Sequence, residues 1–166
     1  MKRFEPSGPL PLGTAVLEAS AGTGKTHAIA ALATRYLAEG RVSADRLAVI
    51  SFSRIASAEL RSRVRDRMRS TAETLTHGLS GTLRHLPDET DGLLLDGTEA
   101  EVQARLGNLR RAIATLDAAS IMTIHQFCQA MLNELGVLAE ADPQATLVGA
   151  LATCIWEPLL AAEVPA

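Results

Sequence analysis

The sequence is poor in several features that define other classes of protein. Aromatic residues make up only 3% of the 166 residues, so any core must be built mainly from aliphatic side chains. The two cysteines, Cys128 and Cys154, have no C-x-x-C partner, which gives no sign of a zinc site or disulfide scaffold and suits a reducing compartment. No apolar run approaches the roughly 18 residues that span a membrane. Prolines interrupt the N-terminal "MKRFEPSGPLPLG" where a signal peptide needs an apolar stretch, so we expect a cytoplasmic protein.

The net charge argues against a protein that is basic over its whole surface. It is −3, but it is unevenly distributed along the chain. Between Ser53 and Arg69, six arginines accompany two acidic residues, which gives this segment a local charge of +4 and leaves −7 for the remainder. This segment is therefore a candidate anion-binding face.

The length suffices for one domain, and its pattern alternates between strands and helices. Residues 76–97 mix Gly, Pro, Asp and His without a period, and we expect a surface loop there. Apolar runs predict strands at 14–19, 46–51 and 120–124, and helical spacing predicts helices at 25–39, from 55 to about 75, at 98–119 and from 125 to Gly136. This alternation predicts an α/β fold, a parallel sheet in three layers that binds ligands at the carboxyl ends of its strands.

The strongest motif, A-S-A-G-T-G-K-T, follows the first predicted strand. It fits the phosphate-binding loop except that Ala19 occupies the first glycine position. Gly22 and Gly24 allow backbone N–H groups to point at phosphate oxygens, at the positive end of the following helix. Lys25 is placed to bind the β and γ phosphates, and the Thr26 hydroxyl to bind Mg²⁺. The predicted nucleotide contacts are Ala19, Ser20, Ala21, Gly22, Thr23, Gly24, Lys25 and Thr26; an incidental glycine-rich turn is the alternative.

Two further segments follow the second and third predicted strands, "SFSRIASAELRSRV" at 51–64 and "TIHQFCQAML" at 123–132. Together with "EASAGTGKT", they resemble the ordered motifs of superfamily 1A DNA helicases of the UvrD/Rep type. The closest likeness is to the N-terminal part of the RecB-type beta subunits of exodeoxyribonuclease V. The resemblance covers about residues 4–148; it implies a RecA-like P-loop fold, an incomplete motor domain 1A, and ATP and Mg²⁺ as cofactors. We expect residues 1–148 to be the N-terminal part of a UvrD-like ATP-binding domain and residues 149–166 to be a divergent tail.

The resemblance also implies contacts with single-stranded DNA. Small hydroxyls, aromatic rings and cations suit phosphates and bases chemically. Phe52 follows a predicted buried strand, so a role in the core is an equal alternative for it. For His125 the alternative is a structural role, which is more common for a lone histidine. Arg54 departs from the family pattern, which commonly has Asn or Glu at this position. The arginines from 61 to 69 are spaced by two, so on a helix they scatter around the surface, and we expect most to be solvated. The implied DNA contacts are Ser51, Phe52, Ser53, Arg61, Arg63, Thr123, His125 and Phe127.

The sequence lacks the D-E-x-Q-D carboxylates with which such helicases hold Mg²⁺ and activate water, and it lacks the arginines of a second motor domain. Asp88 and Glu89 are adjacent acids, but they lie in a predicted loop and are poor substitutes. We therefore expect the ATP-binding N-terminal segment of an ATP-dependent DNA helicase, RecB-like and acting in DNA end processing and recombinational repair, that does not hydrolyse ATP alone. An unpaired sheet edge and uncovered apolar faces predict a marginally stable fragment.

Two other classes of function stay open. One is a truncated, non-catalytic fragment that binds nucleotide or DNA. The other is a small P-loop kinase, which needs an acidic Mg²⁺ partner on a later strand and a substrate lid, and neither is found in the sequence. The implied partners are single-stranded or duplex-end DNA and, in a longer parent protein, other exodeoxyribonuclease V subunits; no membrane partner is implied.

Overall fold

The computed structural model describes residues 4–18, 20, 22–85 and 88–139. They belong to two compact units, Met1–Met122 and Thr123–Ala166. The first unit contains the glycine-rich loop, the sheet pairing and most of the helices, and the second contains one described helix.

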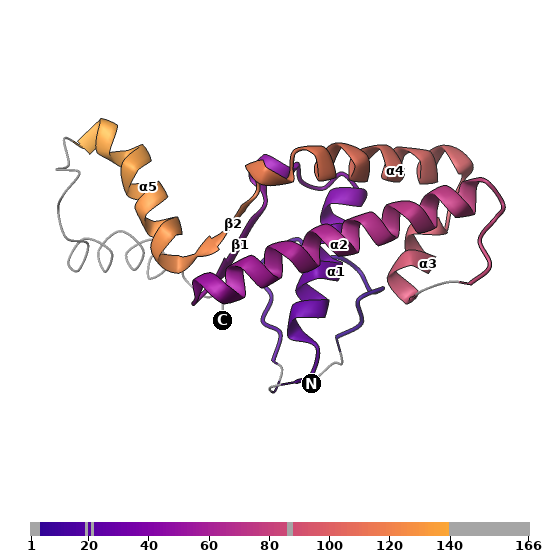
Figure 1. Cartoon of the computed structure of the whole chain (residues 1–166), viewed down its shortest axis with the longest axis horizontal. Helices are drawn as coiled ribbons and strands as arrows, with labels where there is room; N and C mark the ends of the chain where they lie inside the picture. Colours follow the sequence, from indigo (N-terminus) through magenta and orange to yellow (C-terminus); the bar gives the residue numbers. More distant parts are fainter. Residues whose placement is uncertain (1–3, 19, 21, 86–87, 140–166) are drawn as a thin grey trace, which may run out of the picture. The chain divides into compact units, whose positions relative to one another are not determined.

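Three helices form the body of the first unit: α1 (Lys25–Ala38), α2 (Arg54–Leu79) and α4 (Glu99–Ala114). They pack against one another, and α2 is the longest (Figure 1). Their apolar faces supply most of the core, where Val64, Met68, Leu75 and Leu109 are fully buried. Burial of these aliphatic side chains is the main stabilising contribution, as the shortage of aromatic residues predicts.

The sheet of the first unit is small. Strands β1 (Ala48–Ser51) and β2 (Ser120–Thr123) form a two-stranded parallel sheet, and next to it the N–H of Ser120 donates to the carbonyl of Leu47 at 3.0 Å. Val49 packs against the core, whereas Ala48 and Ile50 on the opposite face of β1 are exposed. Within the first unit, helices therefore cover one face of β1, whereas the alternating pattern predicts helices on both faces of the sheet.

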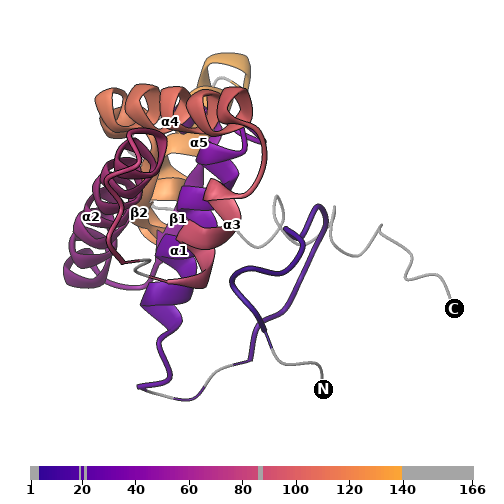
Figure 2. The ribbon, with the colours of Figure 1, turned by 90° about the vertical axis from the view of Figure 1, so that its right-hand side faces the viewer.

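The strand predicted at 14–19 is not found among the described residues. Residues 14–18 form a loop before α1 (Figure 2), and Ala19 lies outside the described part of the chain. A strand is held by hydrogen bonds to a neighbouring strand, and the sheet of β1 and β2 offers none to this segment. The prediction of three strands from apolar runs is therefore wrong for the first of them.

The segment before this loop is held to α1 by polar contacts. The buried guanidinium of Arg35 donates to the carbonyls of Pro6 and Gly8, both at 2.6 Å, and the hydroxyl of Tyr36 donates to the carbonyl of Pro11. These bonds satisfy main-chain carbonyls that no regular element engages. The chain therefore reaches the glycine-rich loop from a fixed position on α1.

The helix predictions differ from the structure mainly at their ends. The segment 76–97, predicted to be a loop, is partly helical, because α2 continues to Leu79 and α3 occupies Glu89–Leu95. The carboxylate of Asp88 caps α3 by accepting from the N–H of Asp91 at 3.0 Å. The helix predicted at 98–119 begins as expected at Thr98, through a capping box, but it ends at Ala114 and is followed by the short 3₁₀ helix η2 (Leu116–Ala118). A second such helix, η1 (Ala44–Arg46), precedes β1.

The second unit contains α5 (Ile124–Ala139). The prediction that Gly136 ends this helix is wrong, because α5 runs through it. A glycine inside a helix costs only about 1 kcal/mol relative to alanine, and apolar residues follow it. Across both units, none of the described helices has the length and apolar character needed to cross a membrane.

Candidate functional site

The glycine-rich loop turns sharply into α1. Gly22 and Gly24 have φ angles of 78° and 87°, in the left-handed region that other residues disfavour. An added Cβ would meet nothing within 4 Å at either position, so backbone conformation and not crowding requires glycine. Thr23 closes the turn, because its N–H and its hydroxyl donate to the carbonyl of Ser20 at 3.4 and 2.7 Å. The predicted contacts Ala19 and Ala21 lie outside the described residues.

Lys25 reaches back over this turn. Its ammonium group donates to the carbonyl of Ser20 at 3.1 Å, and the residue is exposed. Within the described helix α1, the first turn carries no acidic side chain, and Gly24 provides no capping side chain. The first N–H groups of a helix have no partner inside the helix, and together with the helix dipole they attract an anion. The described part of the loop therefore fits a phosphate group.

The fit to Mg²⁺ is more limited. Thr26, the second residue of α1, is half-buried and is the candidate hydroxyl ligand. Over the part of the chain that the structure describes, no three His, Cys, Asp or Glu side chains are gathered to hold a metal. Mg²⁺ commonly binds with one or two protein ligands together with phosphate oxygens and water. The residues present therefore fit an ion that arrives with a nucleotide, not one held by protein alone.

The segment after β1 is organised by serine hydroxyls. Ser51 Oγ is hydrogen-bonded to Ser57 Oγ at 2.6 Å and donates to the carbonyl of Ser53 at 3.2 Å. Ser53 caps α2, since its Oγ accepts from the N–H of Ala56 at 3.1 Å. Between them Phe52 is 95% exposed, so it is not a core residue in this structure. Ser57 was not among the predicted site residues, although it lies within the second motif.

Four of the five arginines from 61 to 69 make side-chain contacts, although Arg63 and Arg69 remain exposed to solvent as expected. Arg63 pairs with Glu59 one turn earlier at 2.8 Å and stays 55% exposed. The other pairs tie α2 to different elements: Arg61 to the carbonyl of Ile121 at 2.8 Å, Arg65 to Asp117 at 2.8 Å, and Arg67 to Asp88 at 2.6 Å and Asp91 at 3.0 Å. These contacts join residues far apart in sequence, which a periodicity argument does not detect.

In the second unit, the third motif begins α5 with a capping box. Thr123 Oγ1 accepts from the N–H of Gln126 at 3.3 Å, and Gln126 Oε1 accepts from the N–H and the hydroxyl of Thr123, both at 3.0 Å. His125 is exposed, Phe127 is half-buried, and Cys128 is buried as a packing residue. Gln126 was missed by sequence reasoning, although T-x-x-Q is itself the capping-box pattern.

Asp88 and Asp91 hold α3 on α2 around Arg67. Burial would raise the pKa of Asp88, but hydrogen bonds from Arg67 and from the N–H of Asp91 outweigh it, so this pKa lies below its ordinary value. Burial raises the pKa of Asp91 despite hydrogen bonds from the Thr71 hydroxyl and Arg67, and its Oδ2 has no hydrogen-bond partner among the described residues. Asp88 is thus a helix cap and an ion-pair partner, which explains its presence without a metal.

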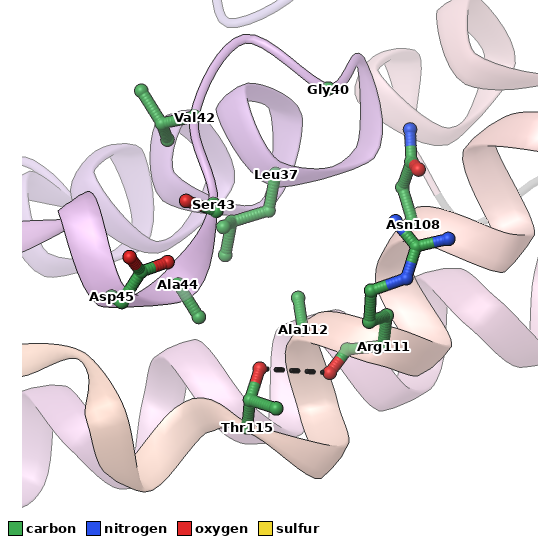
Figure 3. A pocket seen from close by; sticks show the side chains of 10 residues that line it. All are labelled: Leu37, Gly40, Val42, Ser43, Ala44, Asp45, Asn108, Arg111, Ala112 and Thr115. Atoms are coloured by element: carbon green, nitrogen blue, oxygen red, sulfur yellow. Dashed lines mark hydrogen bonds between the residues drawn. The ribbon is translucent and has the colours of Figure 1, made fainter.

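A cavity of about 480 Å³ lies at the C-terminal end of α1, the opposite end from the glycine-rich loop (Figure 3). Aliphatic side chains form much of its lining. Polar side chains accompany them, and Figure 3 shows Asn108 and Arg111 side by side on α4. Its lining residues are Leu37, Gly40, Val42, Ser43, Ala44, Asp45, Asn108, Arg111, Ala112 and Thr115. None of them belongs to the three motifs, so this cavity is not the nucleotide site that the sequence predicts.

Comparison with known proteins identifies the family. The model of the UvrD/REP helicase N-terminal domain matches residues 6–153, a stretch that includes all three motifs. The chain belongs to this family. The resemblance inferred from the three motifs is therefore confirmed.

RecB subunits are among the relatives of this UvrD/REP helicase domain. The chain is 44% identical to the RecBCD enzyme subunit RecB of Mycolicibacterium smegmatis and 43% identical to that of Mycobacterium tuberculosis, in both cases over 95% of the chain. It is 37% identical to the RecBCD enzyme subunit RecB of Escherichia coli over 79% of the chain. The chain spans 14% of the length of the two mycobacterial relatives and 12% of the E. coli one.

Proposed function

We propose that this chain binds ATP at residues 19–26 and single-stranded DNA at residues 51–63 and 123–127, as the N-terminal ATP-binding segment of a RecB-like DNA helicase. In a longer parent protein it would act on DNA ends in recombinational repair. The family match over residues 6–153 carries the proposal, because this range includes all three motifs. Residues 1–148 would form part of a RecA-like motor domain 1A, with residues 149–166 as a separate tail.

The nucleotide role rests on the loop and the start of α1. Backbone N–H groups of the loop and of the first helical turn would donate to phosphate oxygens. Lys25 would exchange its bond to the Ser20 carbonyl for one to the β and γ phosphates. Thr26 would bind the Mg²⁺ that accompanies the nucleotide and neutralises its charge. The left-handed glycines and the lack of an acidic side chain in the first turn of α1 support this assignment.

The DNA role rests on the ends of the two strands. Phe52 would stack on a base, since its ring is exposed while the serines on either side are held by hydrogen bonds. Ser51, Ser53 and Thr123 end their strands or begin the following helices, where main-chain N–H groups suit a phosphate backbone. Arg63 would add charge, and His125 and Phe127 would contribute from α5.

ATP hydrolysis by this chain alone is not part of the proposal. The sequence contains no D-E-x-Q-D segment, and the described acidic residues Asp88 and Asp91 are engaged by Arg67. The relatives are named as subunits of the RecBCD enzyme, which supports a parent protein that assembles with other exodeoxyribonuclease V subunits.

Turnover of ATP in the presence of single-stranded DNA tests this account. The purified chain should release no phosphate above background, with or without an oligonucleotide. Lys25→Ala is the informative variant, and Arg84→Ala, which removes an exposed cation outside the motifs, is its control. A DNA-stimulated hydrolysis rate that Lys25→Ala abolishes and Arg84→Ala preserves would overturn the claim that the chain binds without hydrolysing.

A further inference from the structure

Arg61 lies in the second turn of α2, between two core residues. Leu60 and Val64 are buried on either side of it, so this part of the helix is fixed on the body of the first unit. The Nη2 group of Arg61 donates to the main-chain carbonyl of Ile121 in β2 at 2.8 Å. The side chain of Ile121 is buried as well, so both ends of the contact are anchored in the core.

The neighbouring arginines of α2 have different surroundings. Arg63 is more than half exposed, and its one partner in the described part of the chain is Glu59 of the same helix. Arg65 also binds a residue outside α2, but this partner, Asp117, is 86% exposed, so solvent weakens the ion pair. Among these three arginines, only Arg61 bonds to the main chain of the sheet. The three arginines therefore carry the same charge on the same helix but have different structural roles.

The contact adds a bond from α2 to a short strand. β2 pairs only with β1 among the described residues, and Thr123 follows Ile121 by two positions in the sequence. A guanidinium-to-carbonyl bond is charge-assisted, and it is stronger and more directional than a bond between neutral groups. Moving Arg61 to a DNA phosphate would break the bond and leave the Ile121 carbonyl without this partner.

We propose that Arg61 is a positioning residue for DNA binding and not a phosphate ligand. It holds β2 to α2 at Ile121, two residues before the Thr123–Phe127 segment. The inference rests on the proposed function, because it requires that this segment and the one around Phe52 contact DNA. It reassigns Arg61 from the predicted DNA contacts and leaves Arg63 among them.

The salt dependence of binding separates the two roles. Each phosphate contact to a single strand contributes about −0.7 to the slope of log K against log salt concentration. Removing a phosphate ligand therefore makes the slope shallower, whereas removing a positioning residue lowers the affinity at every salt concentration and leaves the slope unchanged. Fluorescence anisotropy of a labelled oligothymidylate with the full chain measures both quantities.

Four variants carry the test: Arg61→Ala, Arg61→Lys, Arg63→Ala and Arg65→Ala. Arg61→Ala should weaken binding on the order of tenfold without changing the slope. Arg61→Lys should recover part of the affinity, because an ammonium group can also donate to the Ile121 carbonyl. Arg65→Ala removes the same charge and a contact of the same helix, and it should stay within about twofold of the wild type. Arg63→Ala should make the slope shallower by about 0.7.

Two results would overturn the inference. One is a shallower slope of log K against log salt concentration for Arg61→Ala, which would mark Arg61 as a phosphate ligand. The other is an affinity of Arg61→Ala for the oligothymidylate equal to that of the wild type. If Arg61→Ala does not fold, as judged by circular dichroism, the affinity and the salt slope of Arg61→Lys are compared with those of Arg65→Ala. An affinity of Arg61→Lys equal to that of Arg65→Ala, or a shallower slope, would then overturn the inference. Hydrogen exchange gives an independent measure, and the amides of residues 121–123 should exchange faster in Arg61→Lys than in Arg65→Ala. A wild-type chain that fails to bind the oligonucleotide would contradict the proposed function itself, whereas wild-type binding with unaffected Arg61 variants contradicts only the role of Arg61.

Discussion

Phe52 is one of three phenylalanines in a chain with few aromatic residues, and it lies almost fully in solvent. Ile55, in the first turn of α2, is 83% exposed as well. A single exposed apolar residue is ordinary, but two exposed apolar side chains three residues apart, one of them an aromatic ring, offer bases a surface on which to stack. At the scale of residues, this pair is the observation most specific to nucleic acid.

Replacement of Phe52 should therefore affect DNA binding without affecting the fold. Phe52→Ala should weaken binding of single-stranded DNA by about 1 to 3 kcal/mol, the range measured for one stacked base. Phe52→Trp should retain most of the affinity, because an indole also stacks. Ile29→Ala, which removes a partly exposed apolar side chain from α1, is the control. An affinity for DNA that is equal in Phe52→Ala and wild type would rule out stacking.

The pKa values of Asp88 and Asp91 predict opposite effects of pH on stability. The pKa of Asp91 is raised above 3.8, mainly by burial, so its contribution to stability is present at low pH and is lost as the pH rises through the raised pKa. The pKa of Asp88 is lowered because its hydrogen bonds outweigh burial, so its contribution is present above 3.8 and is lost as the pH falls. Thermal unfolding measured between pH 3 and 7 should test both effects. As the pH rises, the stability of Asp91→Asn should increase relative to the wild type, and the stability of Asp88→Asn should decrease relative to it. Parallel curves for the three proteins would contradict the assignment.

Among the helices and strands, those specified by neighbouring residues could be predicted from the sequence. The capping box at Thr98 and Glu101 and the left-handed Gly40 after α1, with φ of 67°, act within one turn of the chain. α3 could not be predicted in the same way, because Arg67, 21 residues before Asp88, helps to hold its cap. Residues 14–18 show the converse, an apolar run that has strand propensity but no partner strand in the described sheet.

Two glycines inside helices give a matched test at this scale. Gly107 lies in α4 with nothing within 4 Å of an added Cβ, so Gly107→Ala should stabilise the chain by about 0.5 to 1 kcal/mol. Gly78 lies in α2, where an added Cβ would overlap Leu95 Cδ2 of α3. Gly78→Ala should gain less than Gly107→Ala or lose stability, because Leu95 must move. Chemical denaturation measures both differences, and an equal gain at the two positions would show that the contact between α2 and α3 is not formed as described.

For the whole molecule, the motifs of the candidate site are visible in the sequence, whereas the long-range contacts around them are not. The glycines of the loop, Phe52 and the capping residues Ser53 and Thr123 lie in short motifs that can be read directly. The bonds from Arg61 and Arg67 join distant residues and are visible only in the folded chain. Ala48 and Ile50 leave one face of β1 exposed, so the described residues bury only part of their apolar surface. The marginal stability expected from the sequence therefore remains a prediction.

The central claim is that the loop at 19–26 binds ATP in a chain that does not hydrolyse it. Equilibrium dialysis against labelled ATP and Mg²⁺, with the bound nucleotide recovered and identified, tests binding and turnover in one measurement. We predict saturable binding of about one ATP per chain, recovered intact, that is lost in Lys25→Ala and preserved in the control Arg84→Ala. Absence of saturable binding in the folded wild-type chain, or recovery of the nucleotide as ADP, would contradict the account.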